Sequence, residues 1–407
     1  MRAPIGLVRP GAALVALALA LALGGKDPAS AEPESKYLAP AEAAVAQSNE
    51  WWDSGRHWYR QRLGNPDRLA TLWGVVHLFE AKDALAIADP TPGRIAAVRN
   101  FARGAERYWN PDLRPAGGYG ASPGTPGSKR RAWYDDDGWW GTAFYDAYRA
   151  TGDAHYLASA KRALMFVDAG WDRRKGGIWW DTRHSFHAGE SLAGGTLTAA
   201  YLYRETHSPR YLALANRYIR WADADFRGAD GLYDRNEHDP TPMPYVQGPM
   251  ALALVVICRA SGDSDYCDEG EELADRAARR FPKLTMGPQY DAMYVRAMLE
   301  LYRFDHNPRW YRIATAAADR ALANARGADG LFLLTWDGRP MRTIGTPAGM
   351  LQTHAATTSV LAWLAATPSP GSPGSRCDAV PATRSRSASR RKRRCSRSRG
   401  RCASPAP

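Results

Sequence analysis

Residues 145–157 read YDAYRATGDAHYL, a segment in which one amphipathic helix ends at a Thr-Gly-Asp turn and a second helix begins. Glycine commonly ends helices and aspartate begins them, so the segment predicts two helices joined by a short turn. Similar segments recur about every 45–55 residues: YLYRETHSPRYL at 201–212, VICRASGDSDY at 256–266 and LYRFDHNPRWY at 301–311. The recurrence predicts a fold built from helical hairpins.

A second pattern lies between these hairpins. It places an aliphatic residue, an aromatic residue and an acid after glycine, as in GIWWD at 177–181, GLYD at 231–234 and the segment 330–337. We expect each copy to lie in a longer loop and the few strand signals to be confined to these loops. In a ring of paired helices, such loops meet on one face and can form a cleft.

The fold class that these patterns predict is all-α. Apolar periodicity gives roughly eleven or twelve helical segments between Pro40 and Ala366, which suits six pairs. We therefore expect an (α/α)6 barrel. No long Pro/Gly-rich linker divides this region, so the prediction is one catalytic domain at 32–370.

The N-terminal residues 1–31 have the features of a signal peptide. Arg2 and Arg9 precede an apolar run at 11–23, and the small residues Ala29-Ser30-Ala31 follow it. The run is shorter than the roughly 20 residues that a membrane span needs, although an uncleaved anchor is the alternative. We expect a protein that is secreted or associated with the cell wall, with no membrane span after signal removal.

The formal charge of +12 is concentrated at the chain ends. Residues 371–407 carry eleven Lys/Arg and one Asp, residues 1–31 carry a net +2, and the body at 32–370 is therefore neutral. A neutral body lacks the basic excess that nucleic-acid binding requires. The basic Arg/Ser/Pro-rich tail is expected to be disordered. It either attaches the protein to an anionic surface or results from a shifted reading frame.

Two of the five cysteines lie in the body. Cys258 and Cys267 flank a short polar segment between two expected helices. In an exported protein they favour a disulfide across the hairpin, and two free thiols are the alternative. No Cys/His spacing indicates a zinc site.

The segment WYDDDGWWGTAF at 133–144 carries the chemistry. Its acids Asp135, Asp136 and Asp137 precede apolar residues at helical spacing, so they are expected at a helix N-terminus. One aspartate there is an ordinary cap, but three neighbouring charges repel one another, so that one carboxyl keeps its proton to a higher pH. A calcium site is a second alternative, although the regular ligand spacing of a calcium loop is missing.

Retaining glycoside hydrolysis uses such a pair. One ionised carboxylate attacks the anomeric carbon and one protonated carboxyl donates to the leaving oxygen, from a separation of about 5–5.5 Å. The 15 Trp and 19 Tyr offer faces on which sugar rings stack, although most of the tryptophans are expected to pack in the core.

Four segments resemble a known family. Tyr-Asp-Asp-x-x-Trp-Trp at 134–140 is similar to the signature of glycoside hydrolase family 76, the endo-α-1,6-mannanases. Gly-Gly-Ile-Trp-Trp-Asp at 176–181, Tyr-Val-Gln-Gly at 245–248, and Asp291 with the following Tyr-Val-Arg resemble further segments of the family in order and spacing. The resemblance extends over roughly 41–366.

The resemblance implies an (α/α)6 barrel and a retaining mechanism without a catalytic metal or other cofactor. It implies Asp135 as nucleophile and Asp136 as general acid/base. The residues that it places near the substrate are Asp137, Trp139, Trp179, Trp180, Tyr245, Gln247 and Asp291.

The sequence departs from the family in two places. Asp137 stands where the family often has Asn, Glu or Gln, which allows a shift of the pair to Asp136 and Asp137, although the spacing to Trp139-Trp140 favours the unshifted pair. An Asn-rich family segment is replaced at 185–195 by residues that include His187 and Glu190, so the contacts to the cleaved sugar are open.

The favoured interpretation is a monomeric, endo-acting mannan endo-1,6-α-mannosidase that binds mannan or manno-oligosaccharides. A sugar epimerase similar to N-acylglucosamine 2-epimerase is an alternative, with a histidine as proton shuttle. Its candidates are His77, His184, His187 and His354, which are scattered in the sequence. A glycan binder or transglycosylase of the cell wall that does not hydrolyse its ligand is the third interpretation.

Overall fold

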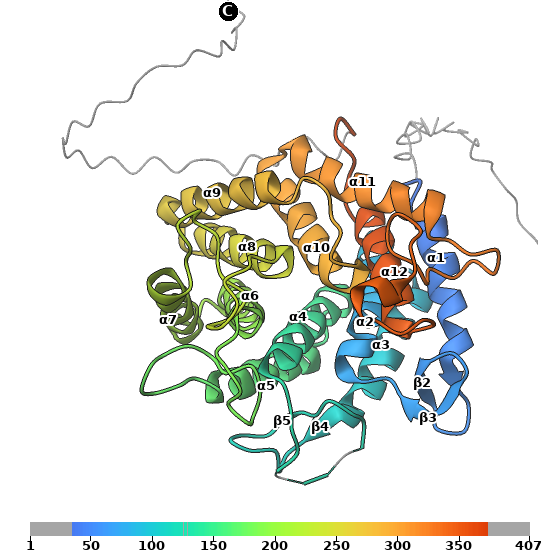
Figure 1. The fold of residues 1–407 in the computed structure, drawn as a ribbon, viewed down its shortest axis with the longest axis horizontal. Coiled ribbons are helices and arrows are strands. Elements are labelled where there is room, and N and C mark those ends of the chain that lie inside the picture. The colour runs from blue at the N-terminus through green and yellow to red at the C-terminus, as the bar shows by residue number, and fades with distance from the viewer. Residues whose placement is uncertain (1–34, 125, 128, 373–407) are drawn as a thin grey trace, which may run out of the picture.

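A computed structural model describes residues 35–124, 126–127 and 129–372. Six helices form an inner ring in which each contacts the next and the last contacts the first (Figure 1). The inner helices are α2 (Leu72–Ala88), α4 (Tyr134–Thr151), α6 (Gly189–Thr206), α8 (Pro244–Ser261), α10 (Pro288–Asp305) and α12 (Leu351–Ala365).

Six more helices pack outside this ring, each against one or two inner helices. They are α1 (Leu38–Gln47), α3 (Pro92–Ala105), α5 (Ala154–Ala169), α7 (Pro209–Asp225), α9 (Ser264–Arg280) and α11 (Pro308–Asn324). The two rings confirm the all-α class and the (α/α)6 barrel.

The inner and outer helices differ in how many of their residues are buried, and their sequences predict this difference. Fourteen of the fifteen residues of α12 are buried, and apart from Gln352 and His354 their side chains are apolar or those of serine and threonine. In α9, by contrast, five of seventeen residues are buried, and most of the others are acidic or basic. A helix that is apolar nearly all round lies inside a protein, whereas one with a narrow apolar stripe lies at its surface.

The short turns follow the inner helices. Gly152 and Gly262 end α4 and α8 in the left-handed conformation, with φ of 69° and 78°, and Asp153 and Asp263 then cap the next outer helix through their side chains. A left-handed residue closes a helix end at no steric cost when it is glycine. These caps confirm the predicted hairpins.

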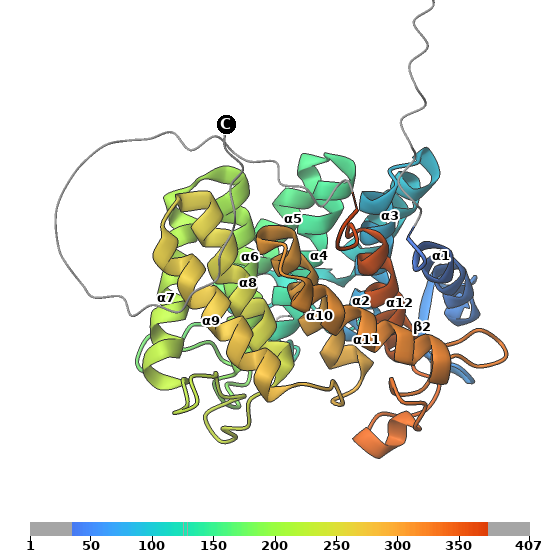
Figure 2. The ribbon, with the colours of Figure 1, turned by 90° about the horizontal axis from the view of Figure 1, so that it is seen from above.

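The long loops all lead into the N-termini of the inner helices and so surround one end of the barrel. They include 48–71, 106–133, 170–188, 226–243 and 325–350. Figure 2 shows several of them gathered along one edge of the molecule. The loops therefore meet on one face, as the alternation of short and long connections predicts.

The strands lie elsewhere than expected. Strands β1 (Trp52–Asp53), β2 (Trp58–Arg62) and β3 (Asn65–Leu69) form an antiparallel sheet, and β4 (Trp109–Asn110) pairs with β5 (Gly118–Tyr119). The glycine–aromatic–acid loops contribute isolated bridges, such as Trp171 to Ile178. The hairpin of β2 and β3 depends on contacts with distant residues, for example Leu63 N–H to Gly349 O at 2.9 Å.

The disulfide favoured by the sequence is present, and it joins Cys258 at the end of α8 to Cys267 in α9. Among the described residues, no helix combines the length and the apolar character that crossing a membrane requires. The predicted signal peptide at 1–31 and residues 373–407 of the predicted tail lie outside the described residues.

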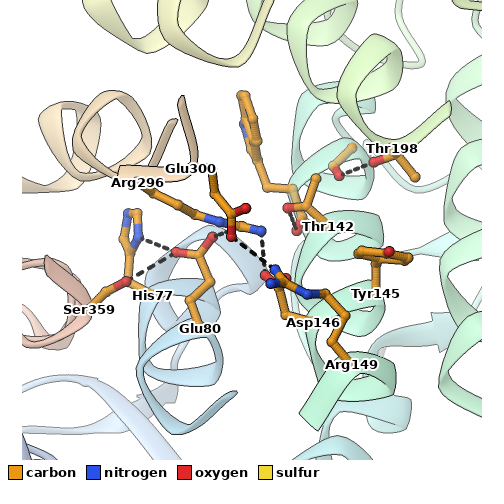
Figure 3. Close-up of polar contacts among 12 residues, drawn as sticks. His77, Glu80, Thr142, Tyr145, Asp146, Arg149, Thr198, Arg296, Glu300 and Ser359 are labelled. Atoms are coloured by element: carbon orange, nitrogen blue, oxygen red, sulfur yellow. Dashed lines mark hydrogen bonds and ion pairs between the residues drawn. The ribbon is translucent and has the colours of Figure 1, made fainter. Parts of the chain in front are cut away.

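A buried charge network ties three inner helices together inside the barrel (Figure 3). Arg296 of α10 forms ion pairs with Glu80 of α2, at 2.8 Å, and with Asp146 of α4. His77 contacts the other oxygen of Glu80 at 3.0 Å. Buried charges persist where they are paired, so this network fixes how α2, α4 and α10 sit around the axis.

Candidate active site

A cavity of about 910 Å³ opens at the barrel end that carries the long loops. Five inner helices contribute to its wall through residues in their first turns. These residues are Trp73 of α2, Asp135 and Asp136 of α4, Glu190 of α6, Tyr245 of α8 and Tyr290 of α10. The loops add Trp133, Trp180, Arg235, Pro347, Met350 and several residues of β2 and β3.

The start of α4 is held by the neighbouring loop. Tyr134 N–H donates to Trp180 O at 3.0 Å, and Trp133 forms a bridge with Asp181. The acids at 135–137 occupy the first helical turn, where the unpaired backbone N–H groups and the helix dipole favour negative charge.

The three acids face different surroundings. Asp135 and Asp136 line the cavity and keep 7% and 9% of their surface exposed. Asp137 is fully buried, lies outside the cavity lining and accepts a hydrogen bond from Tyr119 N–H at 2.9 Å. The pair that lines the cavity is thus Asp135 and Asp136, whereas Asp137, which belongs to the shifted pair that the sequence left open, lies outside the lining.

The pKa values of both carboxyls in the pair are raised above the ordinary value for aspartate. Burial raises the pKa of Asp136 to about 7. Burial also raises the pKa of Asp135 well above its ordinary value, and repulsion from Asp136 and Glu190 raises it further. Because buried like charges resist joint ionisation, the pair retains a proton near neutral pH.

Tyr245 connects this pair to the barrel. Its hydroxyl donates to Asp135 Oδ2 at 3.4 Å and accepts a hydrogen bond from Trp139 Nε1 at 2.9 Å. Burial, followed by the charge of Asp135, raises the pKa of Tyr245 strongly, so its hydroxyl stays a donor. Trp139 is itself buried and lies outside the cavity lining, so it acts on Asp135 only through Tyr245.

A third carboxylate reaches the cavity from α6. Glu190 is 6% exposed, and its Oε1 lies 3.3 Å from Arg235 Nε in an ion pair. Its Oε2 has no hydrogen-bond partner among the described residues. Burial raises the pKa of Glu190. A buried carboxylate oxygen with no protein partner is available to a ligand hydroxyl.

Aromatic rings form much of the remaining wall. Trp73, Tyr245 and Tyr290 meet edge to face or tilted, with centroids 5.6–6.1 Å apart. Trp180 packs edge to face on Trp133, and its ring is also close to the Arg131 guanidinium. Such rings offer flat apolar faces beside polar groups, which suits a sugar.

Three other residues that the resemblance placed near the substrate lie outside the cavity lining. Gln247 is fully buried and bonds both backbone groups of Tyr233, at 2.9 and 2.7 Å. Asp291 is fully buried and accepts hydrogen bonds from Trp336 Nε1 and Gly287 N–H. Each holds a long loop onto an inner helix.

The third, Trp179, is half-buried and stacks between two histidines. Its ring centroid lies 4.9 Å from that of His184 and 3.9 Å from that of His187. Of the substrate residues predicted from the sequence, Trp180 and Tyr245 therefore line the cavity beside the two catalytic candidates.

Sequence reasoning missed Trp73, Tyr290 and Arg235, and noted Glu190 only as a departure from a family pattern. A positional signal was available. Trp73, Asp135, Glu190 and Tyr245 are each the second residue of an inner helix. The described residues contain no group of three or more His, Cys, Asp or Glu side chains arranged to hold a metal ion.

Comparison with known proteins adds to this geometry. Residues 125–294 match the model of glycosyl hydrolase family 76. No curated protein sequence matches the chain.

Several solved structures share the fold. A family 76 α-mannanase from Bacteroides thetaiotaomicron has a TM-score of 0.74 at 21% identity, over 81% of this chain and 95% of that one. The GH76A α-1,6-mannanase of Salegentibacter sp. HEL1_6 has a TM-score of 0.66 at 18% identity, over 81% and 99%. A cellobiose 2-epimerase from Spirochaeta thermophila has a TM-score of 0.56 at 16% identity, over 81% and 97%.

The family-model match covers the acid pair, Trp180, Glu190, Arg235 and Tyr245, and the solved structures share the barrel that carries them. Residues 125–294 are thus similar to glycosyl hydrolase family 76, and this match supports a glycosidase.

Proposed function

We propose that the protein is a retaining hydrolase that cleaves α-1,6-mannosidic linkages within mannan chains. The observation that carries the proposal is the pair Asp135 and Asp136, two neighbouring carboxyls that line one cavity and whose pKa values are raised by burial. A retaining glycosidase needs one ionised and one protonated carboxyl at the same bond.

In the proposed mechanism, Asp136 donates its proton to the glycosidic oxygen while the carboxylate of Asp135 forms a bond to the anomeric carbon. The bond between that carbon and the leaving oxygen breaks. Water then attacks the anomeric carbon, gives its proton to Asp136 and releases Asp135.

The Tyr245 hydroxyl supports this division of roles, because its hydrogen bond to Asp135 Oδ2 stabilises the carboxylate form.

The size and wall of the cavity support action within a chain. A volume of about 910 Å³ is at the upper end of the range for ligand sites and suits an oligosaccharide. An inactive variant of the Salegentibacter enzyme was solved in complex with α-1,6-mannotriose. That enzyme has the same fold as this chain at 17% identity. Its bound sugar supports α-1,6-linked mannose as the substrate proposed here.

The epimerase alternative requires a histidine at the reacting carbon. The four candidate histidines are all outside the cavity lining. His77 contacts Glu80, His187 contacts Glu237, and His354 lies between Ala44 O and Phe332 N–H. This chain therefore shares the fold of the cellobiose 2-epimerase, but none of the candidate histidines lines its cavity.

The test is product analysis after incubation of the full chain with linear α-1,6-mannan. We expect a ladder of manno-oligosaccharides with new reducing ends. Release of mannose alone would contradict endo action, and a C2-epimerised sugar without new reducing ends would contradict hydrolysis.

Asp136→Asn is the first variant to assay. We expect it to abolish oligosaccharide release, because an amide has no proton to give to the leaving oxygen, while the melting temperature stays close to that of the unmodified protein. Asp137→Asn is the matched control, because Asp137 is buried outside the cavity lining. Near-normal turnover by Asp136→Asn would remove its acid/base role.

We also propose that the enzyme acts outside the cell. The disulfide between Cys258 and Cys267 supports this location, because disulfides persist mainly in oxidising compartments. Immunodetection in the medium and wall fractions of the source cells tests the proposal. Retention in the cytosol with both thiols free would contradict it.

A further inference from the structure

The cavity has a second chemical feature, which lies on the β2–β3 hairpin. We propose that this wall binds an anionic substituent of the mannan, a phosphate or a carboxylate, through Arg62 and Arg68. The inference rests on the proposed function and names the substrate class of the same site. It goes beyond that function because an unsubstituted mannan carries no charge.

Both arginines are placed at the cavity by the hairpin. Arg62 ends β2 and Arg68 lies within β3, and both line the cavity. Arg62 also forms a bridge with Met350 in the loop before α12. A Cβ built on Gly349 would lie 3.6 Å from Arg62 Cγ, so the stem of Arg62 is held between two segments.

The charges of these two side chains are free. Of the four arginines at 52–69, Arg56 and Arg60 are paired with Asp53, at 2.7 and 3.3 Å. Within the described part of the chain, Arg62 and Arg68 form no ion pair, side-chain hydrogen bond or contact with an aromatic face. Guanidinium groups that are free in this way bind phosphate or carboxylate oxygens bidentately.

The positive charge of this wall does not reflect a general excess of basic residues in the body of the protein. Residues 32–370 carry no net charge, whereas residues 52–69 carry four arginines and two aspartates, a net of +2. The second of these acids, Asp67, also lines the cavity, but it lies beyond ion-pair distance from Arg62 and Arg68.

Unpaired charges of opposite sign lie on different elements of the cavity wall. Asp135 and Asp136 lie on α4, Glu190 on α6 is paired with Arg235, and the free cations lie on the hairpin beside Asp67. An anionic substituent is repelled by the acids of α4 and attracted by the free cations. The wall would therefore hold the charged sugar away from the acid pair and present an uncharged linkage for cleavage.

Binding is measured by calorimetric titration of the full chain carrying Asp136→Asn. The neutral probe is α-1,6-mannotetraose. Three charged probes are made from the same tetraose: one has a phosphate ester on O6 of the non-reducing end, one has a methyl phosphodiester at the reducing end, and one ends in mannuronic acid. The two phosphate probes cover both directions of the chain in the cavity, and the mannuronate probe separates carboxylate from phosphate recognition.

We expect at least one charged probe to bind about tenfold more tightly than the neutral tetraose at about 50 mM NaCl, the size of one charge-assisted hydrogen bond. The preference should shrink at about 500 mM NaCl, because salt screens exposed charges. It should fall to about one when Arg62→Gln and Arg68→Gln are added.

Two controls make the result specific. Arg220→Gln removes an exposed arginine of the outer helix α7, outside the cavity, and should leave the preference intact. Arg68→Gln alone changes an exposed side chain, so it gives a second reading if the double variant unfolds. The basic segment 371–407 is present in every variant, so the effect of the two arginines is taken as the change in preference between variants.

Equal binding of neutral and charged probes would overturn the inference, as would a preference that survives Arg62→Gln with Arg68→Gln. Cleavage of neutral mannotetraose by the unmodified chain is measured in parallel. If it is cleaved and no charge preference appears, only this inference fails. If no mannan is cleaved but the preference depends on the two arginines, the proposed hydrolysis fails and the anion site stands.

Discussion

At the scale of single residues, the proposed mechanism depends on how Asp135 is held. Its Oδ2 has one partner among the described side chains, the Tyr245 hydroxyl, and that hydroxyl is positioned by Trp139 Nε1. Tyr245 is thus a positioning residue whose hydrogen bond favours the nucleophilic form of Asp135.

Tyr245→Phe should therefore lower kcat by about tenfold or more, because it removes a hydrogen bond to a charged group. The acid limb of the pH–rate profile should shift to higher pH, since Asp135 loses a group that favours ionisation. Steady-state rates on α-1,6-mannan across pH 4–9 measure both effects. A change in KM alone, with an unmoved pH profile, would reduce Tyr245 to a packing residue.

Asp291 makes a separate prediction about stability. Burial raises its pKa to about 7, against about 3.9 in an unfolded chain. A carboxyl with a raised pKa in the folded state binds more protons there, so stability falls as pH rises from about 4 through 7.

Asp291→Asn keeps an oxygen for Trp336 Nε1 and Gly287 N–H and removes this ionisation. We expect the variant to match the unmodified protein at pH 4 and to exceed it at pH 8, by up to about 4 kcal/mol at 1.36 kcal/mol per pKa unit. Urea unfolding at the two pH values measures the difference. If the two proteins differ in free energy of unfolding by the same amount at pH 4 and pH 8, Asp291 does not titrate in this way.

At the scale of elements, the helical hairpins could be predicted because their signals are local. The Thr-Gly-Asp turn at 151–153 ends one helix and caps the next whatever surrounds it. The acid pair was predictable for the same reason. The β2–β3 hairpin was not, because it depends on the distant loop before α12, where Gly349 O accepts a hydrogen bond from Leu63 N–H.

The difference between local and long-range contacts also explains which residues of the candidate site could be predicted from the sequence. Glu190 and Arg235 are 45 positions apart, and their pairing depends on how the loop before α8 folds back. Gln247 looks like a substrate residue in the sequence, yet both ends of its amide are bonded to Tyr233. Whether a polar side chain faces a cavity or a neighbouring loop is set by tertiary packing, which no local pattern contains.

The disulfide supplies a prediction for α8 and α9. Replacing Cys258 and Cys267 by serine should lower the free energy of unfolding by about 2–3 kcal/mol, because a short loop is no longer closed in the unfolded chain. Hydrolysis should be unchanged below the melting temperature, since Tyr245 lies at the opposite end of α8. Denaturant unfolding and an activity assay at 25 °C test the two parts. Loss of activity in a folded variant would contradict the separation.

At the scale of the whole molecule, five helices of the closed inner ring line one cavity with residues of their first turns, and the charge network of Figure 3 holds three of those helices in place. Arg296 is the shared partner of Glu80 and Asp146. Its removal would leave two buried carboxylates without their common counter-charge.

Arg296→Ala should accordingly destabilise the barrel by about 3–5 kcal/mol, the range for breaking a buried ion pair from one side. The exposed Arg220→Ala is the matched control and should change stability by less than about 0.5 kcal/mol. Urea denaturation followed by tryptophan fluorescence compares them. Similar midpoints for the two variants would show that the network does not stabilise the ring.

The most direct test of the central claim is the anomeric form of the first product, followed by proton NMR during hydrolysis of linear α-1,6-mannan. Two inversions at the anomeric carbon, first by Asp135 and then by water, give net retention. We predict that the new reducing end appears first as the α-anomer and equilibrates to β later. A β-anomer at the outset would contradict the paired-carboxylate account.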